Sequence, residues 1–477
     1  MQPGIGSRDG PAIPGRHVIR QFDEILIRRM ARRKWILLQE LAEEVRGGQV
    51  EGRIVDQSDH AHCPRTCISS GQSAYPKLLD LTAYYNEHDP KFRPAALAQE
   101  RAPDLVRFRS DLDSFIQRSM TGLEAVPGLA IAVVDASGTV HTHGYGLADV
   151  EAHAPATADT PFYIASSTKS FTALAIAAMA ARGELDLDAP LSTLSPGSGI
   201  PAGIAGQVTL TDLLSHRAGV ENDPITYRLA YTGDWTAQQL WSLTGETREG
   251  EVARGTFQYG NVGYNLATIL IEGARQRDWH TMVHDEVLAP LGMTHTTADI
   301  DQLRASGRAV AVGYLGLQAG QPERAYQQKT NSTMHSAGGL VSTANDMSRW
   351  LAAQINDGVV EGRKVLPTGL VASTHESRVV QDRTFGSYVR TGYGLGWQVG
   401  RYGDDLMLHH FGNFSGNRAH VSFMPDRKLG VAVMINEDAV AGVFADLVAN
   451  YVYDWFRGIP DLDATYQARR GGADCGS

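Results

Sequence analysis

The sequence predicts a mixed α+β domain in which the two ends of the folded region meet in one antiparallel sheet. Two observations lead to this prediction. Short runs of β-branched and aromatic residues occur within residues 128–146 and again within 391–436, whereas residues 210–291 between them have a mainly helical pattern with Gly and Pro interruptions. Strands at both ends of a helical region can pair in a single sheet that the helices cover.

Length divides the chain into three expected parts. A chain of 477 residues exceeds the size at which one compact core usually stops growing. We expect an N-terminal extension over residues 1–104, partly helical or poorly ordered, then a folded domain over residues 105–460. A flexible tail over residues 461–477 would follow.

The N-terminal extension carries two patterns of its own. An Arg-rich amphipathic segment over residues 16–46 favours a solvated accessory helix or a poorly ordered extension, with a membrane-surface or partner contact as the alternative. Two histidines and two cysteines within residues 60–67 are side chains that zinc accepts. Because their spacing matches no closed zinc module, we interpret the cluster as a loop.

The first elements of the folded domain follow from periodicity. Helical spacing covers residues 111–120, and residues 128–146 read as a hairpin around an Asp-Ala-Ser-Gly turn. An Ala-rich helix is expected from Ser166 to about Arg182, because Gly183 follows it and helices often end at glycine.

The last elements complete the predicted sheet. Apolar runs over residues 394–399, 418–424 and 430–436 predict strands. A final apolar helix is expected over about residues 440–456. These strands would pair with the N-terminal hairpin.

Composition excludes several functional classes. The formal net charge of −10 argues against a nucleic-acid partner, which would normally show a basic field. The chain has no apolar run long enough to cross a bilayer, so we expect no transmembrane segment. Three cysteines do not describe a disulfide framework. Because no secretory signal is recognisable, we expect a cytoplasmic location by default.

The sharpest chemical signal is the run Ser166-Ser-Thr-Lys169 at the start of the Ala-rich helix. Positions i and i+3 lie on one helix face, so the serine Oγ and the lysine Nζ can come within hydrogen-bond reach. A lysine with a lowered pKa can take the serine proton and so create a nucleophile. The alternative is an N-cap serine followed by a solvent-facing lysine.

Further motifs follow this run in order along the chain. They are Leu-Leu-Ser-His-Arg-Ala-Gly at 213–219, Tyr-Gly-Asn at 259–261, Pro-Leu-Gly-Met-Thr at 290–294, Ser-Ala-Gly-Gly-Leu-Val-Ser-Thr-Ala-Asn-Asp-Met at 336–347 and His-Phe-Gly at 410–412. With them the chain resembles the serine β-lactamase and penicillin-binding-protein superfamily, particularly its branch of class C β-lactamases, DD-carboxypeptidases, D-aminopeptidases and related esterases. The resemblance covers about residues 105–460. It implies a β-lactamase/transpeptidase-like α+β fold, with an antiparallel sheet of five or more strands flanked by helices and a mainly helical second lobe.

The resemblance also implies a role for each matching residue. Ser166 would be the acylated nucleophile, Lys169 its general base and Tyr259 the proton shuttle to the leaving group. Asn261 would orient the substrate amide and contact Lys169. His410 would replace the lysine of the family's third motif and hydrogen-bond Tyr259 or a substrate carboxylate.

The strand that carries His410 would complete the site. Gly412 would let the strand approach the substrate without a Cβ atom in the way. The backbone N–H groups of Ser166 and Asn413 would form an oxyanion hole. His409 is the neighbouring alternative to His410, which we prefer because of the spacing to Gly412. We interpret His216, in the Leu-Leu-Ser-His stretch, as structural.

The histidine at position 410 bears on the substrate. A lysine suits a carboxylate-bearing β-lactam, whereas histidine is neutral for much of the time near pH 7. Because DD-peptidases, D-aminopeptidases and esterases of the superfamily tolerate His-x-Gly, the resemblance implies an esterase or D-amino-acid-type peptidase. It would act on a small molecule or peptide through an acyl-enzyme, without cofactor or metal. The alternatives are a β-lactamase, an acyltransferase on the same scaffold and a catalytically silent penicillin-recognising protein.

Overall fold

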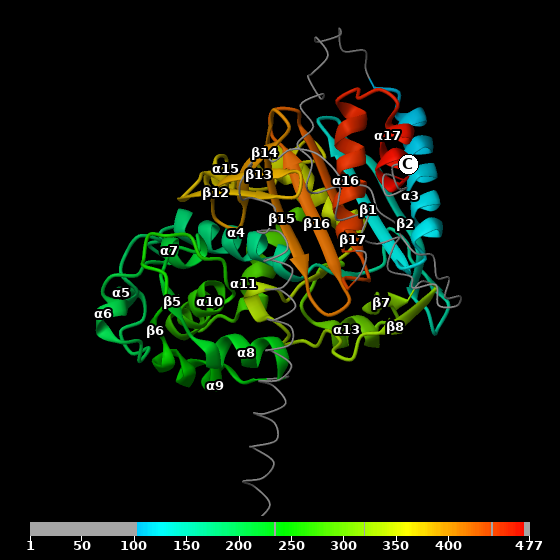
Figure 1. Ribbon diagram of the computed structural model, residues 1–477. Coiled ribbons are helices and arrows are strands. Elements are labelled where there is room, and N and C mark those ends of the chain that lie inside the picture. The colour runs from blue at the N-terminus through cyan, green and yellow to red at the C-terminus, as the bar shows by residue number, and fades with distance from the viewer. Residues whose placement is uncertain (1–102, 233–234, 319, 440–441, 472–477) are drawn as a thin grey trace, which may run out of the picture. The chain divides into compact units, whose positions relative to one another are not determined.

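The computed structural model has a nine-stranded antiparallel sheet at its centre, in the order β12-β13-β14-β15-β16-β17-β1-β2-β3 (Figure 1). It describes residues 103–232, 235–318, 320–439 and 442–471. The predictions for residues 16–46 and 60–67 lie outside these. The strands are β1 (Gly128–Asp135), β2 (Gly138–Asp149), β3 (Ala154–Pro155), β12 (Val379–Phe385), β13 (Tyr388–Tyr393), β14 (Gln398–Tyr402), β15 (Asp405–Asn413), β16 (Arg418–Met424) and β17 (Leu429–Ile435).

The central strand β1 shows why the sheet is covered on both faces. Its residues alternate between two hydrophobic clusters: Ala130, Ala132 and Val134 belong to one, and Leu129, Ile131 and Val133 belong to the other. Successive side chains of a strand point to opposite faces of the sheet, so all of them are buried only if both faces are packed. β1 pairs with β2 on one side and with β17 on the other, so the N-terminal hairpin closes onto the last strand of the chain, as predicted.

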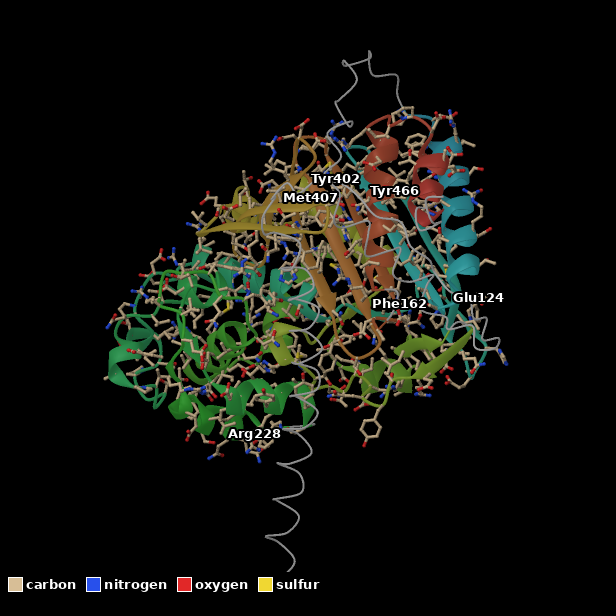
Figure 2. All side chains as sticks on the ribbon, viewed as in Figure 1. Glu124, Phe162, Arg228, Tyr402, Met407 and Tyr466 are labelled. Atoms are coloured by element: carbon tan, nitrogen blue, oxygen red, sulfur yellow. The ribbon has the colours of Figure 1, made fainter. Side chains whose placement is uncertain are left out.

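Helices supply the two layers. The first cluster includes side chains of α4 (Thr168–Ala181), α10 (Val262–Arg275) and α14 (Ala344–Ile355). The second includes side chains of α3 (Leu105–Leu123) and α16 (Val443–Phe456), which lie beside the sheet in Figure 1. Tyr402, Met407 and Tyr466 of this second cluster are labelled in Figure 2.

A mainly helical lobe follows α4, which confirms the predicted second lobe (Figure 1). Besides α10, it contains α5 (Leu191–Leu194), α6 (Ala202–Ala205), α7 (Leu210–Leu214), α8 (Asp223–Tyr231), α9 (Ala237–Ser242), α11 (Trp279–Val283), the 3₁₀ turn η2 (Leu243–Glu246) and the strand pair β5 (Val220–Glu221) and β6 (Arg248–Glu249). None of the helices that the structure describes is long and apolar enough to cross a membrane.

Shorter elements join the lobe to the sheet. They are β4 (Phe162–Tyr163), η1 (Ala165–Ser167), η3 (His284–Leu288), α12 (Ala289–Leu291), α13 (Ile300–Ala305), β7 (Tyr314–Gln318), β8 (Gln321–Arg324), η4 (His335–Ala337), β9 (Val341–Ser342), β10 (Val359–Val360), β11 (Arg363–Lys364) and α15 (Leu370–His375). β4 pairs with β9, which brings the segment before α4 next to the segment that follows η4.

The C-terminal segment differs from the prediction. We expected a flexible tail over residues 461–477, but Leu462–Gly471 form helix α17. Tyr466 is 2% exposed, and its ring lies 5.4 Å from the rings of both Phe115 and Tyr451. Its hydroxyl donates to Asp454 at 2.9 Å. Tyr466 and Leu462, which belong to the same hydrophobic cluster as side chains of α3 and α16, dock the helix, although the segment as a whole has few apolar residues.

We predict that Tyr466→Ala lowers the free energy of unfolding by about 3 kcal/mol, because it removes a buried ring and leaves a cavity. Urea denaturation followed by circular dichroism measures the change. Tyr326 is fully exposed, so Tyr326→Ala is the matched control, with an expected change within about 0.5 kcal/mol. Equal effects of the two substitutions would contradict the docking of α17.

Candidate active site

Ser166 lies in the tight turn η1 between β4 and α4. The turn is anchored by the Ile164 N–H, which donates to the Leu340 carbonyl at 3.1 Å. Ala165 has a φ of 43°, a left-handed conformation that costs a residue with a Cβ atom about 1 kcal/mol. The sequence predicted one helix from Ser166, whereas the structure places Ser166 in a strained 3₁₀ turn and begins α4 at Thr168.

The Lys169 side chain is fully buried and faces Ser166. Its Nζ lies 3.1 Å from Ser166 Oγ, 2.8 Å from Asn261 Oδ1 and 2.7 Å from the carbonyl oxygen of Ala337. None of these three contacts is a carboxylate. Burial without a counter-ion disfavours the ammonium form, and the pKa of Lys169 falls well below its usual value of 10.5.

Tyr259 lies close to the same lysine. The Lys169 Nζ is 5.0 Å from the centre of the Tyr259 ring. Although the residue as a whole is 43% exposed, burial of its hydroxyl group raises the pKa of Tyr259 to about 12, against an opposing hydrogen bond with Ser166 and the charge of Arg390. Lys169, Tyr259 and Ser166 are therefore brought together as the sequence predicted.

His216 packs against Tyr259. Its ring centre lies 4.5 Å from that of Tyr259, 4.7 Å from that of Tyr393 and 5.3 Å from that of Tyr264. Its Nδ1 accepts the Gly260 N–H at 3.4 Å. Burial and the charge of nearby Lys169 hold the pKa of His216 well below its usual range. These contacts support a structural role for a neutral imidazole beside the Tyr-Gly-Asn segment.

His410 has a hydrogen-bond partner that the sequence did not predict. Its Nε2 lies 3.1 Å from the Tyr393 hydroxyl, and its Nδ1 lies 2.9 Å from the Phe411 carbonyl. A carbonyl only accepts, so Nδ1 carries the proton and Nε2 accepts from Tyr393. The ring of Tyr259, one of the two partners expected for His410, has its centre 5.9 Å from that of His410.

The alternation of β15 distinguishes His410 from its neighbour. His409 points to the other face of the sheet, where its Nε2 accepts from Arg390 at 3.0 Å and its ring stacks on Phe411. Burial, with nearby positive charge as a smaller cause, holds the pKa of His410 well below its usual range. His410 is thus the histidine on the Lys169 side, as the spacing predicted.

Strand β15 passes very close to the turn that carries Ser166. A Cβ atom at Gly412 would lie 2.0 Å from the Ile164 carbonyl oxygen and 3.2 Å from the Ser166 nitrogen. Ser167 Oγ also donates to the His410 carbonyl at 3.0 Å. Asn413 is the exposed last residue of the strand. Glycine at 412 is therefore required by contact with the protein's own backbone.

Two groups in this arrangement were missed from the sequence. The Ala337 carbonyl accepts a hydrogen bond from Lys169 Nζ, and the Tyr393 hydroxyl forms a hydrogen bond with His410. A backbone acceptor has no side-chain signature, and Tyr393 was noted only as part of a strand-rich region. Among the residues that the structure describes, no group of three or more His, Cys, Asp or Glu could hold a metal ion.

The comparison with protein families decides the relationship. A sequence model of the family named Beta-lactamase matches residues 112–450. The chain belongs to the beta-lactamase family. It is therefore a member of a family of serine hydrolases with this fold, and the predicted resemblance and fold class are confirmed.

Curated relatives agree with this assignment at low identity. Unguisins hydrolase ungD of Aspergillus violaceofuscus is 25% identical over 359 residues, which cover 71% of this chain and 63% of that protein. Protein flp of Staphylococcus aureus is 26% identical over 317 residues, covering 65% and 60% respectively. The chain spans about three fifths of the length of the curated relatives it matches.

Solved structures share the same architecture. The octameric penicillin-binding protein homologue from Pyrococcus abyssi aligns with a TM-score of 0.62 and 25% identity, over 76% of this chain and 80% of that one. D-amino acid amidase from Ochrobactrum anthropi aligns with a TM-score of 0.59 and 24% identity, over 77% and 100%. At 24% identity, the likeness to D-amino acid amidase shows a shared fold only.

We predict that Gly412→Ala destabilises the protein by about 1–3 kcal/mol, because the new methyl group must displace the backbone of β15 or η1. Thermal and urea unfolding measure the effect. At Gly203, in α6, an added Cβ would meet open space, so Gly203→Ala is the control and should be neutral or slightly stabilising. An unaffected Gly412→Ala variant would show that β15 and η1 are less tightly packed.

Proposed function

We propose that this beta-lactamase family member hydrolyses an ester or amide bond through an acyl-enzyme on Ser166, with Lys169 as general base and Tyr259 as proton shuttle. The observation that carries the proposal is the distance of 3.1 Å between Lys169 Nζ and Ser166 Oγ, at a fully buried lysine. Burial lowers the pKa of Lys169 well below its usual value, which favours the neutral amine that can take a proton.

The hydrogen bonds around Lys169 support this role. A neutral amine has two N–H donors and one lone pair. Asn261 Oδ1 and the Ala337 carbonyl oxygen are both acceptors, so they take the two N–H groups. The lone pair is then left for the remaining contact, the hydroxyl of Ser166, which is the orientation that proton abstraction requires.

The reaction follows in two steps. Lys169 takes the proton of Ser166 as Oγ attacks the carbonyl carbon, and the backbone N–H groups of Ser166 and Asn413 stabilise the resulting oxyanion. Tyr259 delivers a proton to the leaving alcohol or amine as the carbon–heteroatom bond breaks, and Lys169 returns a proton to Tyr259. Water then attacks the acyl carbon, and its proton passes through Tyr259 and Lys169 back to Ser166 Oγ as the acyl–oxygen bond breaks and the acid leaves.

Position 410 supports an uncharged ester or amide as the substrate class. Both nitrogens of His410 are engaged, with Phe411 and Tyr393, and its pKa is lowered. The imidazole therefore supplies no positive charge near pH 7 to hold a carboxylate. We accordingly propose an esterase or D-amino-acid-type peptidase acting on a small molecule or peptide, with lactam hydrolysis and acyl transfer as alternatives.

We predict that Ser166→Ala abolishes hydrolysis of a short-chain chromogenic ester and labelling by a fluorophosphonate, because it removes the nucleophile. Ser167→Ala is the matched control, since Ser167 Oγ is committed to the His410 carbonyl. Peptide mass mapping of the wild type and of Ser167→Ala should place the adduct on Ser166. An adduct elsewhere, or undiminished turnover by Ser166→Ala, would contradict the mechanism.

The substrate alternatives are separated in the same assay. Screening esters, D-peptides and a chromogenic lactam ranks the three bonds by kcat/KM. Adding an amine nucleophile to the ester reaction reveals acyl transfer if a transfer product accumulates. A lactam preference would overturn the substrate assignment, whereas the role of Ser166 would stand.

We predict that kcat/KM rises with pH to a plateau and remains there into the alkaline range. Lys169 acts only when neutral, so activity is lost as the pH falls through its lowered pKa, which lies well below 10.5. Tyr259 keeps its proton until pH approaches its raised pKa of about 12. A profile of hydrolysis rate against pH tests this. Half-maximal activity near pH 10.5 would show that Lys169 has an ordinary lysine pKa and is charged in the free enzyme, which would contradict its role as general base.

A further inference from the structure

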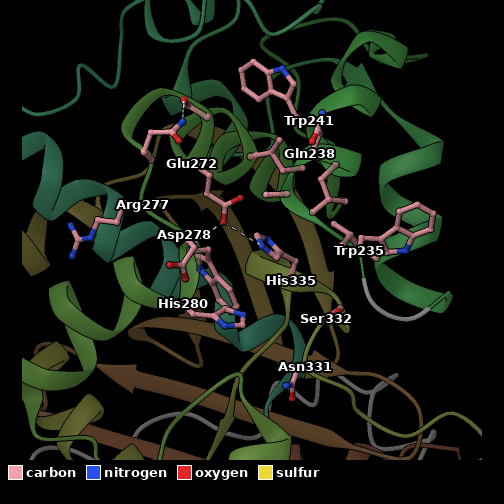
Figure 3. A pocket seen from close by; sticks show the side chains of 17 residues that line it. Trp235, Gln238, Trp241, Glu272, Arg277, Asp278, His280, Asn331, Ser332 and His335 are labelled. Carbon is pink, nitrogen blue, oxygen red and sulfur yellow. Dashed lines mark hydrogen bonds and ion pairs between the residues drawn. The ribbon is translucent and has the colours of Figure 1, made fainter.

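A cavity of about 690 Å³ lies in the helical lobe and contains neither Ser166 nor Lys169 nor Tyr259. A cavity of this size is within the range of small-molecule sites. Its walls come from α8, α9, α10, α11 and the segment that enters η4, and include three tryptophans and two carboxylates (Figure 3): Trp235, Trp241, Trp279, Glu272 and Asp278.

The tryptophans form much of the cavity wall. Trp241 packs closely against α10, because a Cβ atom at Gly273 would be only 2.2 Å from its ring. The Arg228 guanidinium already lies 4.6 Å from the centre of the Trp235 ring, so this indole attracts a cation in the structure itself. Among aromatic side chains, the indole face attracts cations most strongly.

Two carboxylates and one arginine line the cavity, and the Arg228 guanidinium lies against its Trp235 wall. Arg277 lines it, but its guanidinium pairs with Glu286 at 2.7 Å and with Asp285 at 3.0 Å. Burial lowers the pKa of His280, so that imidazole is neutral near pH 7. Glu272 lies between Trp241 and His335 in Figure 3. Its Oε1 accepts the backbone N–H of Trp279 at 2.7 Å and lies 3.4 Å from His335 Nε2.

We propose that this cavity binds a small organic cation, whose ammonium group lies against Glu272 in a space walled by the partly exposed Trp235 and Trp241. A carboxylate beside aromatic faces recognises an alkylammonium group through charge and cation–π attraction together. The proposal goes beyond the hydrolytic function, since the cavity is built from residues that take no part in it.

The cavity is joined to Lys169 by a short run of backbone. His335 begins the turn η4, and the carbonyl of Ala337 at the end of this turn accepts from Lys169 Nζ. Met334 and His335 have φ values of 64° and 43°, so the entry to the turn is strained. A ligand that moves His335 should therefore change the position of the Ala337 carbonyl and the rate of hydrolysis.

A second path supports the same coupling. The Trp279 indole N–H donates to Thr172 Oγ1 at 3.0 Å, and that hydroxyl donates to the Ser336 carbonyl at 2.8 Å. Thr172 lies one turn after Lys169 on α4. Trp279 thus links the cavity both to the helix that carries the lysine and to η4.

The test measures choline binding to the Ser166→Ala protein by isothermal titration calorimetry, with 3,3-dimethylbutan-1-ol as the neutral isostere. We expect one site and binding of choline at least about fivefold tighter than of the isostere. Absence of saturable binding, or equal affinity for the two probes, would overturn the proposal. Because Ser166 is replaced, this result does not depend on the hydrolytic function.

Variants locate the bound cation. Glu272→Gln removes the charge but keeps an oxygen for the backbone N–H of Trp279. It should weaken choline binding about tenfold. Gly273→Ala should also weaken binding, because the methyl group displaces the Trp241 indole without removing charge. Glu323→Gln, on exposed β8, removes a carboxylate that does not line the cavity and should have no effect. Equal loss in Glu323→Gln and Glu272→Gln would overturn the location.

The coupling between the cavity and Lys169 is measured through the rate of ester hydrolysis. Saturating choline should change kcat for the chromogenic ester in the wild type, and Glu272→Gln should shift this response to higher choline concentration. An unchanged kcat at saturation would overturn the coupling. If the wild type has no esterase activity at all, the hydrolytic proposal fails instead, and the calorimetry still decides the site.

Discussion

The site depends on one buried amine, Lys169 Nζ, which has no carboxylate against it among the residues that the structure describes. Lys169 lies inside the core, where an ammonium ion would be strongly disfavoured. Its Nζ is held by atoms from three segments that are far apart in the chain: Ser166 before α4, Asn261 before α10 and Ala337 in η4. The three contacts both satisfy the amine and fix where its lone pair points.

The sheet provides the rigid frame for these contacts. β15 lies against η1 so closely that Gly412 has no room for a side chain, and Ser167 ties the turn to the His410 carbonyl. Because both faces of the sheet are packed, neither the strand nor the turn can shift alone. The strained φ of Ala165 is therefore maintained by its surroundings.

Aromatic residues fill the space between the sheet and the helical lobe. His216, Tyr259, Tyr264 and Tyr393 pack together, and Tyr393 carries the hydrogen bond to His410. This packing keeps both imidazoles neutral and places the Tyr259 ring beside the amine. Specificity for uncharged substrates would thus follow from burial of position 410 as much as from its residue type.

The sequence by itself determined the order of the reactive residues, the hairpin over 128–146, the helical lobe and the α+β class. These are visible because strand alternation, helical spacing and short motifs are local properties of the chain. The choice of His410 over His409 also followed from spacing alone, and β15 places it on the Lys169 side.

Only the tertiary structure decided which groups meet across the chain. The Ala337 acceptor is a backbone carbonyl that any residue could supply, and the Tyr393 partner of His410 depends on the pairing of β13, β14 and β15. α17 docks through Leu462 and Tyr466, two buried residues that are too few to give a periodic apolar pattern. The tryptophan-lined cavity likewise arises from five separate segments, because long-range packing, and not local pattern, sets which side chains share a space.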